Sequence, residues 1–320
     1  MKPVVLVTAV GTVAASHIVL ELKKINEYYI IGADINPANQ IATSADVDEF
    51  HVFPSAISDL EGYIDYVIDF CRNKKVEYYF AIIDEEVANL SAHRSIFEKN
   101  GIKLCIANDS LVEICHYKDK FNRWIADNMP QIAIKTFSSV DEIADSDYPL
   151  FVKPIEGRAS IGCKMISDKN ELIQYANEND LSNVIIQQCI SGEIITIDLV
   201  RNSMTKQMTQ VQRVELLRNS SGCGIAVEII NDETLSGICN DLMKLMDLNG
   251  VVNAEFFKTE NAYKIIEVNP RFSAGTSFSC MAGCNTVLNA LRIAQNKDCE
   301  LGDVAPGQHF AKRYETYRLD

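Results

Sequence analysis

The 320-residue sequence lacks several patterns that would place it in a common class of protein. It has 10 cysteines but no C-x-x-C pair, and their irregular spacing in so long a chain does not suit a disulfide framework. No apolar run is long enough to span a membrane, and the formal net charge of −14 disfavours a nucleic-acid backbone as the principal partner. We therefore expect a cytoplasmic protein with reduced, mostly buried thiols and with neither nucleic acid nor membrane as a partner.

Three signatures of familiar enzyme chemistry are also missing. The first strand-to-helix turn contains only Gly11, so it lacks the G-x-G-x-x-G pattern of dinucleotide-binding domains. The loop that follows Lys153 is not closed by G-K-[ST], so it is not a P-loop. No Ser-His or Cys-His constellation indicates a protein nucleophile. We therefore expect any nucleotide to be held by other residues, in a reaction that needs no covalent enzyme intermediate.

What the sequence does contain is an ordinary globular composition and a βαβ pattern. A hydrophobic fraction of 47% with 23% charged residues is typical of a soluble protein of two or three structural units. Residues 1–107 alternate between apolar strands and amphipathic helices, which predicts a small Rossmann-like unit. The apolar segment after Lys2 imitates a signal peptide, but the turn at Gly11 and the helix after it favour strand–turn–helix. The expected strands are residues 4–10, 29–34, 78–83 and 103–106, and the expected helices are residues 16–25, 63–71 and 86–100.

Acidic residues at two strand ends of this unit each allow two interpretations. Asp34 could bind a ribose or simply cap the end of its strand. Asp84, Glu85 and Glu86 lie where a strand gives way to a helix, and the helix dipole favours acidic residues there whether or not they contact a substrate. We favour the helix-dipole explanation.

The remainder of the chain divides into two further parts. A helix over residues 109–128, ended by Met129 and Pro130, begins the second part. Strands and helices alternate up to about residue 200, and residues 181–320 read as a larger α+β unit. We therefore expect a Rossmann-like domain at 1–107, a small subdomain at 108–180 and a C-terminal subdomain at 181–320.

A hairpin near the C-terminus places oxygen ligands on one face. The apolar segments 251–257 and 263–268 read as strands joined by a polar turn, and a turn centred on Asn261 would set Glu255 directly opposite Glu267. Glu267 and Asn269 share a strand face because side chains alternate. Two carboxylates and an amide oxygen suit Mg²⁺ held jointly with nucleotide phosphates. The alternative is the acidic solvent face of an ordinary hairpin.

A glycine-containing loop follows the strand that ends at Lys153. Glycines at 157 and 162 let backbone N–H groups turn toward phosphate oxygens, and Ser160 adds a hydroxyl donor. A flexible hairpin tip is the alternative, but the metal-type hairpin about a hundred residues later favours a phosphate clamp. Lys120 on the 109–128 helix could also reach a phosphate or could simply be solvated.

Three motifs in this order resemble those of the ATP-grasp superfamily. They are K-P-x-x-G-x-x-S-x-G from Lys153, Q-Q-x-x-x-G-E from Gln187, and N-x-E-F with E-x-N-P-R from Asn253 to Arg271. Over essentially the whole chain the likeness is to carbamoyl phosphate synthase large-subunit-like ligases, including the pyrrolysine-synthesis ligase type. It implies an α/β and α+β fold, in which a Rossmann-like pre-ATP-grasp domain precedes a two-subdomain ATP-grasp fold.

The resemblance also implies roles for the matching residues. Lys120 and Lys153 are expected to contact ATP phosphates beneath the loop from Gly157 to Gly162. Arg271 is expected to stabilise the transferred phosphoryl group, and Arg213 to meet a phosphate or a carboxylate substrate. The other implied binding residues are Ser160 and Ile161 in the loop; Gln187, Gln188, Cys189 and Ile190 along adenine; Glu193 on the ribose; and Glu255, Glu267 and Asn269 on two Mg²⁺ ions, with Mn²⁺ as the alternative ion.

One position departs from the superfamily pattern. The ribose-binding glutamate is expected in G-x-E-[YF]-T-V-D, and alignment on Thr196 puts Ile194 at that position. Glu193 is one residue away, which on a strand means the opposite face unless a bulge intervenes.

The function implied by the resemblance is an ATP-dependent ligase that activates a carboxylate as an acyl phosphate and joins it to an amine, with release of ADP and phosphate. Its partners would be these small molecules, with a homodimer left open. Two alternatives remain on the same scaffold: a phosphotransferase that releases a phosphorylated product, and a non-catalytic nucleotide-binding subunit.

Overall fold

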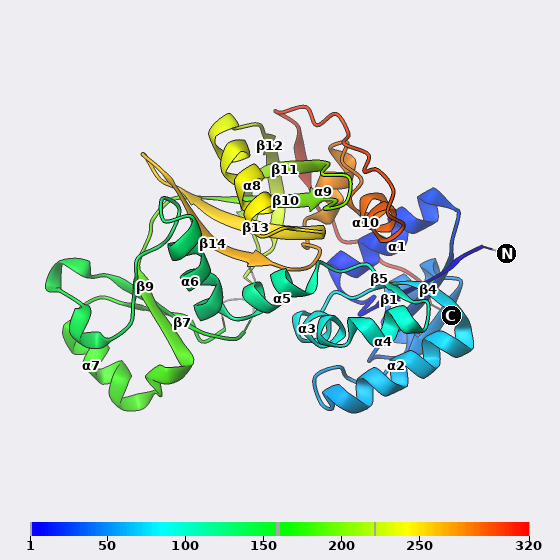
Figure 1. The fold of residues 1–320 in the computed structure, drawn as a ribbon, viewed down its shortest axis with the longest axis horizontal. Coiled ribbons are helices and arrows are strands. Elements are labelled where there is room, and N and C mark those ends of the chain that lie inside the picture. The colour runs from blue at the N-terminus through cyan, green and yellow to red at the C-terminus, as the bar shows by residue number, and fades with distance from the viewer. Residues whose placement is uncertain (1, 158–160, 221, 320) are drawn as a thin grey trace.

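The computed structural model describes residues 2–157, 161–220 and 222–319. These residues form an N-terminal domain and a small subdomain at opposite ends of the molecule, with a C-terminal sheet domain above and between them (Figure 1). No helix in the described ranges is both long and apolar enough to cross a membrane.

The N-terminal domain is a five-stranded parallel sheet with strand order β3-β2-β1-β4-β5. The expected Rossmann-like unit is therefore confirmed. Helix α1 begins after Thr12, whose side chain accepts a hydrogen bond from the Ala15 amide, and ends at Asn26 in the left-handed conformation. The elements are β1 (Val4–Thr8), α1 (Val13–Ile25), β2 (Tyr29–Asp34), β3 (Glu49–Val52), α2 (Leu60–Lys74), β4 (Val76–Phe80), α3 (Asp84–Ala92), α4 (Arg94–Lys99) and β5 (Lys103–Leu104), with 3₁₀ turns at Ala38–Gln40 and Ala42–Asp46.

Two expected helices are each divided by a residue outside the helical conformation. The helix expected over 86–100 divides at His93 (φ −110°, ψ 10°), which separates α3 from α4. The helix expected over 109–128 divides at Tyr117 (φ −104°, ψ 119°), which separates α5 (Asp109–His116) from α6 (Lys118–Asn128). Neither residue is a Gly or Pro, so the usual sequence signals of a break are absent.

The small subdomain is a four-stranded antiparallel sheet with strand order β6-β9-β7-β8. Because β9 pairs with β7, this sheet extends beyond the expected boundary at residue 180, and we propose a boundary after Gln188. The elements are β6 (Thr136–Phe137), β7 (Leu150–Pro154), β8 (Lys164–Ile166), α7 (Lys169–Glu178) and β9 (Val184–Gln188), with 3₁₀ turns at Val140–Glu142, Asp145–Asp147 and Leu181–Asn183.

The C-terminal domain is a six-stranded antiparallel sheet with strand order β14-β13-β10-β11-β12-β15. Its elements are β10 (Glu193–Arg201), β11 (Met208–Arg218), β12 (Gly224–Ile230), α8 (Glu233–Leu245), β13 (Gly250–Lys258), β14 (Tyr263–Asn269), α9 (Thr276–Met281), α10 (Thr286–Ala294) and β15 (His309–Ala311).

The hydrophobic cores join two of the three parts. One buried cluster contains Leu6 and Tyr79 of the N-terminal domain together with Ile195 and Phe256 of the six-stranded sheet. The small subdomain instead has a core of its own around Leu150, with residues contributed by its strands and by α7. The N-terminal and C-terminal domains therefore share one continuous interior, and the small subdomain is a separately packed unit.

Candidate active site

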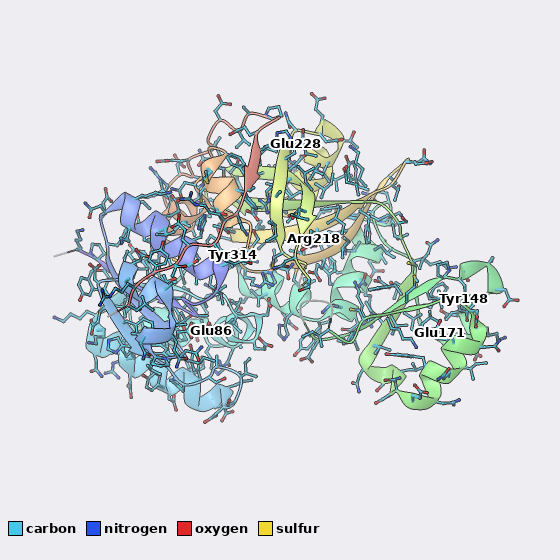
Figure 2. All side chains as sticks on the ribbon, turned by 180° about the vertical axis from the view of Figure 1, so that it is seen from behind. Glu86, Tyr148, Glu171, Arg218, Glu228 and Tyr314 are labelled. Carbon is cyan, nitrogen blue, oxygen red and sulfur yellow. The ribbon has the colours of Figure 1, made fainter. Side chains whose placement is uncertain are left out.

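A cavity of about 490 Å³ lies where the two antiparallel sheets face each other. Its wall includes Phe151 and Lys153 of the four-stranded sheet and Glu255 and Glu267 of the six-stranded sheet. Arg218, which also lines it, lies near the centre of the molecule in Figure 2, beside the strands of the larger sheet. A cavity of this size between two packed units is the usual setting for a small-molecule site.

The hairpin register sets Glu255 directly opposite Glu267, as the sequence predicted. The reason is more specific than the turn length. Lys258 pairs with Tyr263 across the turn, and this spacing alone would set Glu255 opposite Ile266. A bulge at Ile266 shifts the register by one residue and brings Glu267 into place. Beyond it, Asn253 pairs with Asn269, so the polar side chains form two adjacent rows.

The facing carboxylates carry an unfavourable electrostatic interaction. Burial and the charge of Glu267 raise the pKa of Glu255 to about 7, although Arg218 Nη2 lies 3.1 Å from Glu255 Oε2 and opposes this rise. Asn269 Nδ2 donates to Glu267 Oε1 at 3.0 Å, and Arg271 Nη2 donates to Asn269 Oδ1 at 3.2 Å. All the residues expected to bind metal therefore lie together.

This donor set fits a hard divalent cation shared with a nucleotide. In the described part of the chain, no three His, Cys, Asp or Glu side chains form a metal cluster of their own. The hairpin supplies two carboxylates and one amide oxygen, and Mg²⁺ requires six oxygen ligands in all. The remaining ligands would have to be phosphate oxygens and water, which is how Mg²⁺ is commonly bound beside nucleotides.

Lys153 is buried against the hairpin. Lys153 is only 5% exposed, and its Nζ donates a hydrogen bond to the carbonyl of the bulge residue Ile266 at 3.4 Å. Burial lowers the pKa of Lys153, while the negative charge of Glu267 acts in the opposite direction. A desolvated ammonium next to two carboxylates is well placed to bind phosphate oxygens.

The loop after Lys153 is only partly described. Gly157 lines the cavity at a φ of +134°, and Ile161 lines it as well. Gly162 has a φ of +77° but is absent from the cavity wall. Ser160, which was expected to donate to phosphate, lies outside the described residues.

Lys118, and not Lys120, faces the cavity from the start of α6. Lys118 Nζ donates to the carbonyl of Gly157 at 2.8 Å and so contacts the glycine loop. Lys120 Nζ lies 3.2 Å from Glu113 Oε1 and over the ring of Tyr117, outside the cavity wall. Only one of these two lysines reaches the cavity wall, because residues two apart on a helix point in widely different directions.

The residues expected along adenine form part of the same cavity wall. Gln187, Gln188, Cys189 and Ile190 all line it. Gln187 is buried and its Nε2 donates to Asn122 Oδ1 at 2.7 Å and to Thr136 Oγ1 at 2.9 Å, which fixes its side chain. Apolar side chains elsewhere in the cavity wall include Phe121, Ile134, Phe151, Ile194, Phe257 and Ile266. An apolar slot edged by polar groups suits a flat heterocycle.

The expected ribose contact is not supported by the strand register. Glu193 is exposed and pairs with Lys258, and it is absent from the cavity wall. Ile194 lines the cavity instead, because the β10–β13 ladder runs without a bulge through these positions. Side-chain alternation therefore turns Glu193 away from the cavity.

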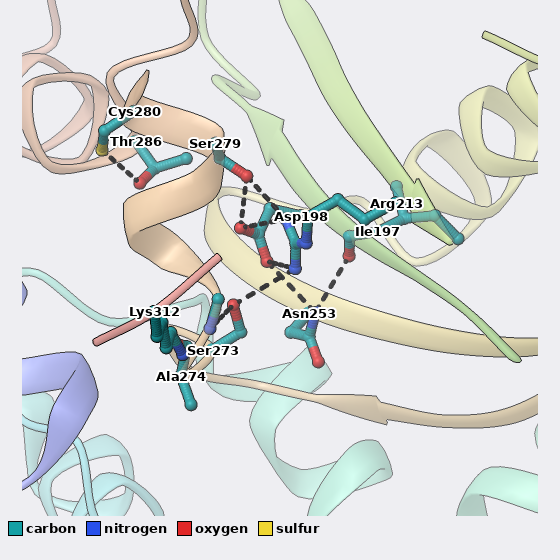
Figure 3. Close-up of polar contacts among 11 residues, drawn as sticks. Ile197, Asp198, Arg213, Asn253, Ser273, Ala274, Ser279, Cys280, Thr286 and Lys312 are labelled. Atoms are coloured by element: carbon teal, nitrogen blue, oxygen red, sulfur yellow. Dashed lines mark hydrogen bonds and ion pairs between the residues drawn. The ribbon is translucent and has the colours of Figure 1, made fainter. Parts of the chain in front are cut away.

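Arg213 also lines the cavity and is completely buried. Its Nη1 lies 2.8 Å from Asp198 Oδ2 and 2.6 Å from Ser279 Oγ, and its Nη2 lies 3.2 Å from Asp198 Oδ1 (Figure 3). Burial alone would raise the pKa of Asp198, but the Arg213 guanidinium and the hydroxyls of Ser279 and Ser273 outweigh it and hold that pKa below its usual value.

Arg271 connects the metal-type hairpin to the N-terminal domain. Its Nε lies 2.7 Å from Oδ1 of Asp84, the first residue of α3, and both side chains are about three-quarters buried. Asp84 and Glu85 line the cavity, whereas Glu86 is buried in a hydrogen-bond cluster within the N-terminal domain. The acidic strand end at residue 84 thus contributes to the site, a role that the sequence analysis did not favour.

The two sheets around this cavity define a nucleotide-binding enzyme fold of the ATP-grasp class. The family described as "ATP-grasp in the biosynthetic pathway with Ter operon" matches residues 180–314, and the family described as "PylC-like, N-terminal domain" matches residues 5–105. These two matches indicate a PylC-like N-terminal domain followed by an ATP-grasp domain. The fold expected from the motifs is confirmed.

Curated relatives are similar at low identity. The carbamoyl phosphate synthase large chain of Clostridium acetobutylicum is 26% identical over 264 residues, which are 75% of this chain and 24% of that protein. The D-alanine–D-alanine ligase of Treponema denticola is 24% identical over 160 residues, 44% of each chain. D-alanine–D-alanine ligase A of Clostridium perfringens is 21% identical over 286 residues, 79% of this chain and 91% of that one. This chain thus spans about a quarter of the synthase.

Solved structures share the fold over nearly the whole chain. The complex of biotin carboxylase with β,γ-ATP from Campylobacter jejuni has a TM-score of 0.76 at 14% identity, over 92% of this chain and 72% of that one. N5-carboxyaminoimidazole ribonucleotide synthetase from Thermotoga maritima has a TM-score of 0.70 at 14% identity, over 95% and 78%. L-amino acid ligase from Bacillus licheniformis has a TM-score of 0.73 at 13% identity, over 97% and 78%.

Proposed function

We propose that this protein is an ATP-dependent ligase that joins a carboxylate to an amine through an acyl phosphate. One observation carries the proposal: the opposed carboxylates of Glu255 and Glu267 and the buried ammonium of Lys153 line one cavity together with apolar side chains. The ligase names of several relatives, and the nucleotide in the biotin carboxylase structure, support it.

The residues of the chain divide the work of binding and positioning. The wall from Gln187 to Ile190 would take the adenine ring, and Lys153 and Lys118 would bind phosphate oxygens. Asp84 would position Arg271 beside the phosphoryl group that is transferred. Because the small subdomain has its own core, it can close over the nucleotide as a unit and exclude water from a hydrolysable intermediate.

Glu255, Glu267 and Asn269 would hold Mg²⁺, or Mn²⁺ in its place. The cation would neutralise charge on the phosphates of ATP and lower the barrier to their nucleophilic attack. Its binding would also remove the repulsion between the two carboxylates, which is evident in the raised pKa of Glu255.

The proposed ligase reaction takes place in two steps. An oxygen of the substrate carboxylate attacks the γ-phosphorus of ATP, the bond to the β–γ bridging oxygen breaks, and ADP leaves with an acyl phosphate formed. The amine then attacks the acyl carbon, the bond from that carbon to the phosphate oxygen breaks, and phosphate leaves as the amine nitrogen loses a proton. Neither step uses a protein nucleophile.

The test is release of ADP and phosphate by the whole chain with ATP, Mg²⁺ and a panel of carboxylates and amines. We expect turnover that requires both substrates and is abolished in Glu267→Gln. The matched control is Glu228→Gln, a half-exposed glutamate on β12 outside the cavity wall, which should retain wild-type turnover.

Three results would contradict the proposal. Full activity in Glu267→Gln would show that turnover does not need this carboxylate, and would contradict the proposed metal site. A stable phosphorylated product formed without any amine would identify a phosphotransferase. Tight ATP binding without turnover on any substrate pair would identify a non-catalytic nucleotide-binding subunit.

A further inference from the structure

A row of polar side chains crosses the six-stranded sheet on the cavity face. Glu267 on β14 faces Glu255 on β13, Glu255 faces Thr196 on β10, and Thr196 faces Arg213 on β11. All four residues line the cavity. Directly opposed residues lie about 5 Å apart at Cβ, so this row leads from the metal-type carboxylates to the buried arginine without interruption.

Two hydrogen-bond donors in this row are buried and unused. Thr196 is 5% exposed and Arg213 is 0% exposed, yet neither Thr196 Oγ1 nor Arg213 Nε has a hydrogen-bond partner among the described residues. The other guanidinium nitrogens of Arg213 are bound to Asp198, Ser279 and Ser273. An unsatisfied buried donor destabilises the fold, so two on neighbouring strands beside a cavity indicate a ligand that accepts from both.

An unused acceptor lies on the same strand face. Glu215 is two residues beyond Arg213 on β11, which places its side chain about 7 Å further along the same side. Its Oε2 is buried without a hydrogen-bond partner in the described ranges, and Glu215 lines the cavity. Gly224 makes room for this carboxylate, because a Cβ at that position would overlap Oε2.

The cations near Glu215 are held by other groups. Lys312 Nζ donates to the carbonyl of Ala274 at 2.6 Å, and Arg218 is bound to Glu255 and to the carbonyl of Gly222. Glu215 therefore keeps an acceptor for a cationic group that enters the cavity from outside.

We propose that the acid activated by this enzyme is an α-amino acid bound as its zwitterion. Its carboxylate accepts from Thr196 Oγ1 and Arg213 Nε, next to the hairpin that is expected to bind metal. Its ammonium group donates to Glu215 Oε2. This inference rests on the proposed ligase function and names the substrate class of the same site.

The three unused atoms explain why an amino acid is favoured over a simple acid. A carboxylate without an ammonium group would satisfy Thr196 and Arg213 but would leave Glu215 buried and unpaired. A site with buried polar groups rejects ligands that lack the matching group far more strongly than an apolar site rejects a missing methylene. Discrimination should therefore reside in Glu215.

The experiment compares each of the twenty common L-amino acids with its des-amino acid, for example L-alanine with propanoate and L-glutamate with glutarate. Binding is measured by calorimetry on the whole chain in the presence of Mg²⁺ and a non-hydrolysable ATP analogue. We expect at least one amino acid to bind about 100-fold more tightly than its des-amino partner. In Glu215→Gln this preference should fall to about threefold, while Glu228→Gln, on the neighbouring strand, keeps it.

The outcome separates this inference from the proposed function. If no amino acid binds while the ATP analogue binds normally, the inference is overturned and the ligase proposal stands for another acid. If an amino acid binds through Glu215 but ADP is never released, the proposed amino-acid subsite is supported and the ligase proposal is wrong. If Glu215→Gln lowers the kcat for amino acids and des-amino acids equally and leaves their affinities unchanged, Glu215 is a general base and the zwitterion site is wrong.

A second variant tests the anionic end. Thr196→Val is nearly isosteric and removes only the hydroxyl, so the fold should be retained. We expect it to weaken amino acids and des-amino acids alike by about tenfold, because both classes carry the carboxylate. Unchanged affinity for both classes would show that Thr196 does not bind the carboxylate, and would overturn the proposed carboxylate subsite.

Discussion

Arg271 Nε lies 2.7 Å from Asp84 Oδ1, and this ion pair joins the last motif of the C-terminal sheet to the first turn of α3 in the N-terminal domain. The same guanidinium donates to Asn269 Oδ1 at 3.2 Å. A residue of the PylC-like domain therefore fixes the orientation of an arginine that faces the proposed metal ligands. The N-terminal domain is in this way a structural part of the candidate active site.

The first prediction concerns this ion pair. Asp84→Asn should lower kcat about tenfold, equivalent to about 1.4 kcal/mol in activation free energy, because Arg271 loses the charge that holds it in place. ATP affinity should change little, since the adenine slot and Lys153 are untouched. The measurement is steady-state ADP release together with calorimetric binding of an ATP analogue.

Asp109→Asn is the matched control, because Asp109 is also the first residue of a helix and pairs with Arg94 away from the cavity. A loss of activity as large in Asp109→Asn as in Asp84→Asn would show a general effect on the N-terminal domain.

The second prediction separates the lysines at the phosphate end. Lys153→Met and Lys118→Met should each weaken the binding of ADP by about tenfold or more, because each removes an ammonium group at the cavity. Lys120→Met should stay within about threefold of wild type, since Lys120 pairs with Glu113 at the surface. Titration calorimetry with ADP and Mg²⁺ measures all three. A large loss in Lys120→Met with none in Lys118→Met would reinstate the expectation drawn from the motif.

The third prediction concerns the buried pair Asp198–Arg213. Asp198→Asn should reduce the free energy of unfolding by about 3–5 kcal/mol, because it leaves a buried guanidinium without its counterion. Urea unfolding at pH 7 measures the loss. Asp241→Asn, an exposed aspartate 3.8 Å from Lys244, should change it by less than about 0.5 kcal/mol.

The same pair predicts a dependence on acid pH. The pKa of Asp198 in the fold is below its usual 3.8, so the carboxylate contributes stability that is fully present above that value. This contribution is lost as the pH falls below 3.8 and through the lower pKa of the folded state. The difference in unfolding free energy between wild type and Asp198→Asn should therefore be constant from pH 7 to pH 5 and shrink below about pH 4. An equally large difference at pH 2 would contradict the assignment.

The fourth prediction concerns the arginine that holds Glu255. Arg218 Nη2 lies 3.1 Å from Glu255 Oε2 and would compete with the proposed metal ion for that oxygen. Arg218→Met should therefore strengthen Mn²⁺ binding to the nucleotide-free protein by about tenfold at pH 8.5, where Glu255 is ionised. Electron paramagnetic resonance of free Mn²⁺ gives the affinity. Arg313→Met, at an 85% exposed side chain, is the control and should have no effect.

The sequence predicted those parts of the site that depend on strand periodicity. Glu255 and Glu267 face each other as expected, although the turn alone would pair Glu255 with Ile266 and only the bulge at Ile266, which the sequence analysis did not foresee, brings Glu267 into place. The same alternation of side chains predicted that Glu193 would lie on the opposite strand face from Ile194, and Glu193 is absent from the cavity wall. The Rossmann-like sheet also follows from patterns of apolar residues that are local in the chain, whereas the two-subdomain ATP-grasp fold after it was implied by the resemblance of the motifs.

Features that depend on contacts distant in sequence were not predicted. The choice of Lys118 over Lys120 depends on how α6 is rotated against the glycine loop, and no local signal records that rotation. Strand β9 belongs to the small subdomain because it pairs with β7, about thirty residues earlier. The role of Asp84 requires Arg271, 187 residues away. Motif order identified the superfamily, but packing determined which neighbouring residue performs each task.

The bulge at Ile266 has a consequence for how this hairpin tolerates changes in length. Removing Ile266 would leave an unbroken ladder in which the two glutamates still oppose each other, at the cost of the carbonyl that receives the Lys153 ammonium. Removing one residue from the turn between Lys258 and Tyr263 would instead shift the register of the two strands by one residue. One of the two carboxylates would then lie on the opposite face of the sheet. Homologous or engineered versions of the hairpin should therefore vary at residue 266 more readily than in the number of residues at its tip.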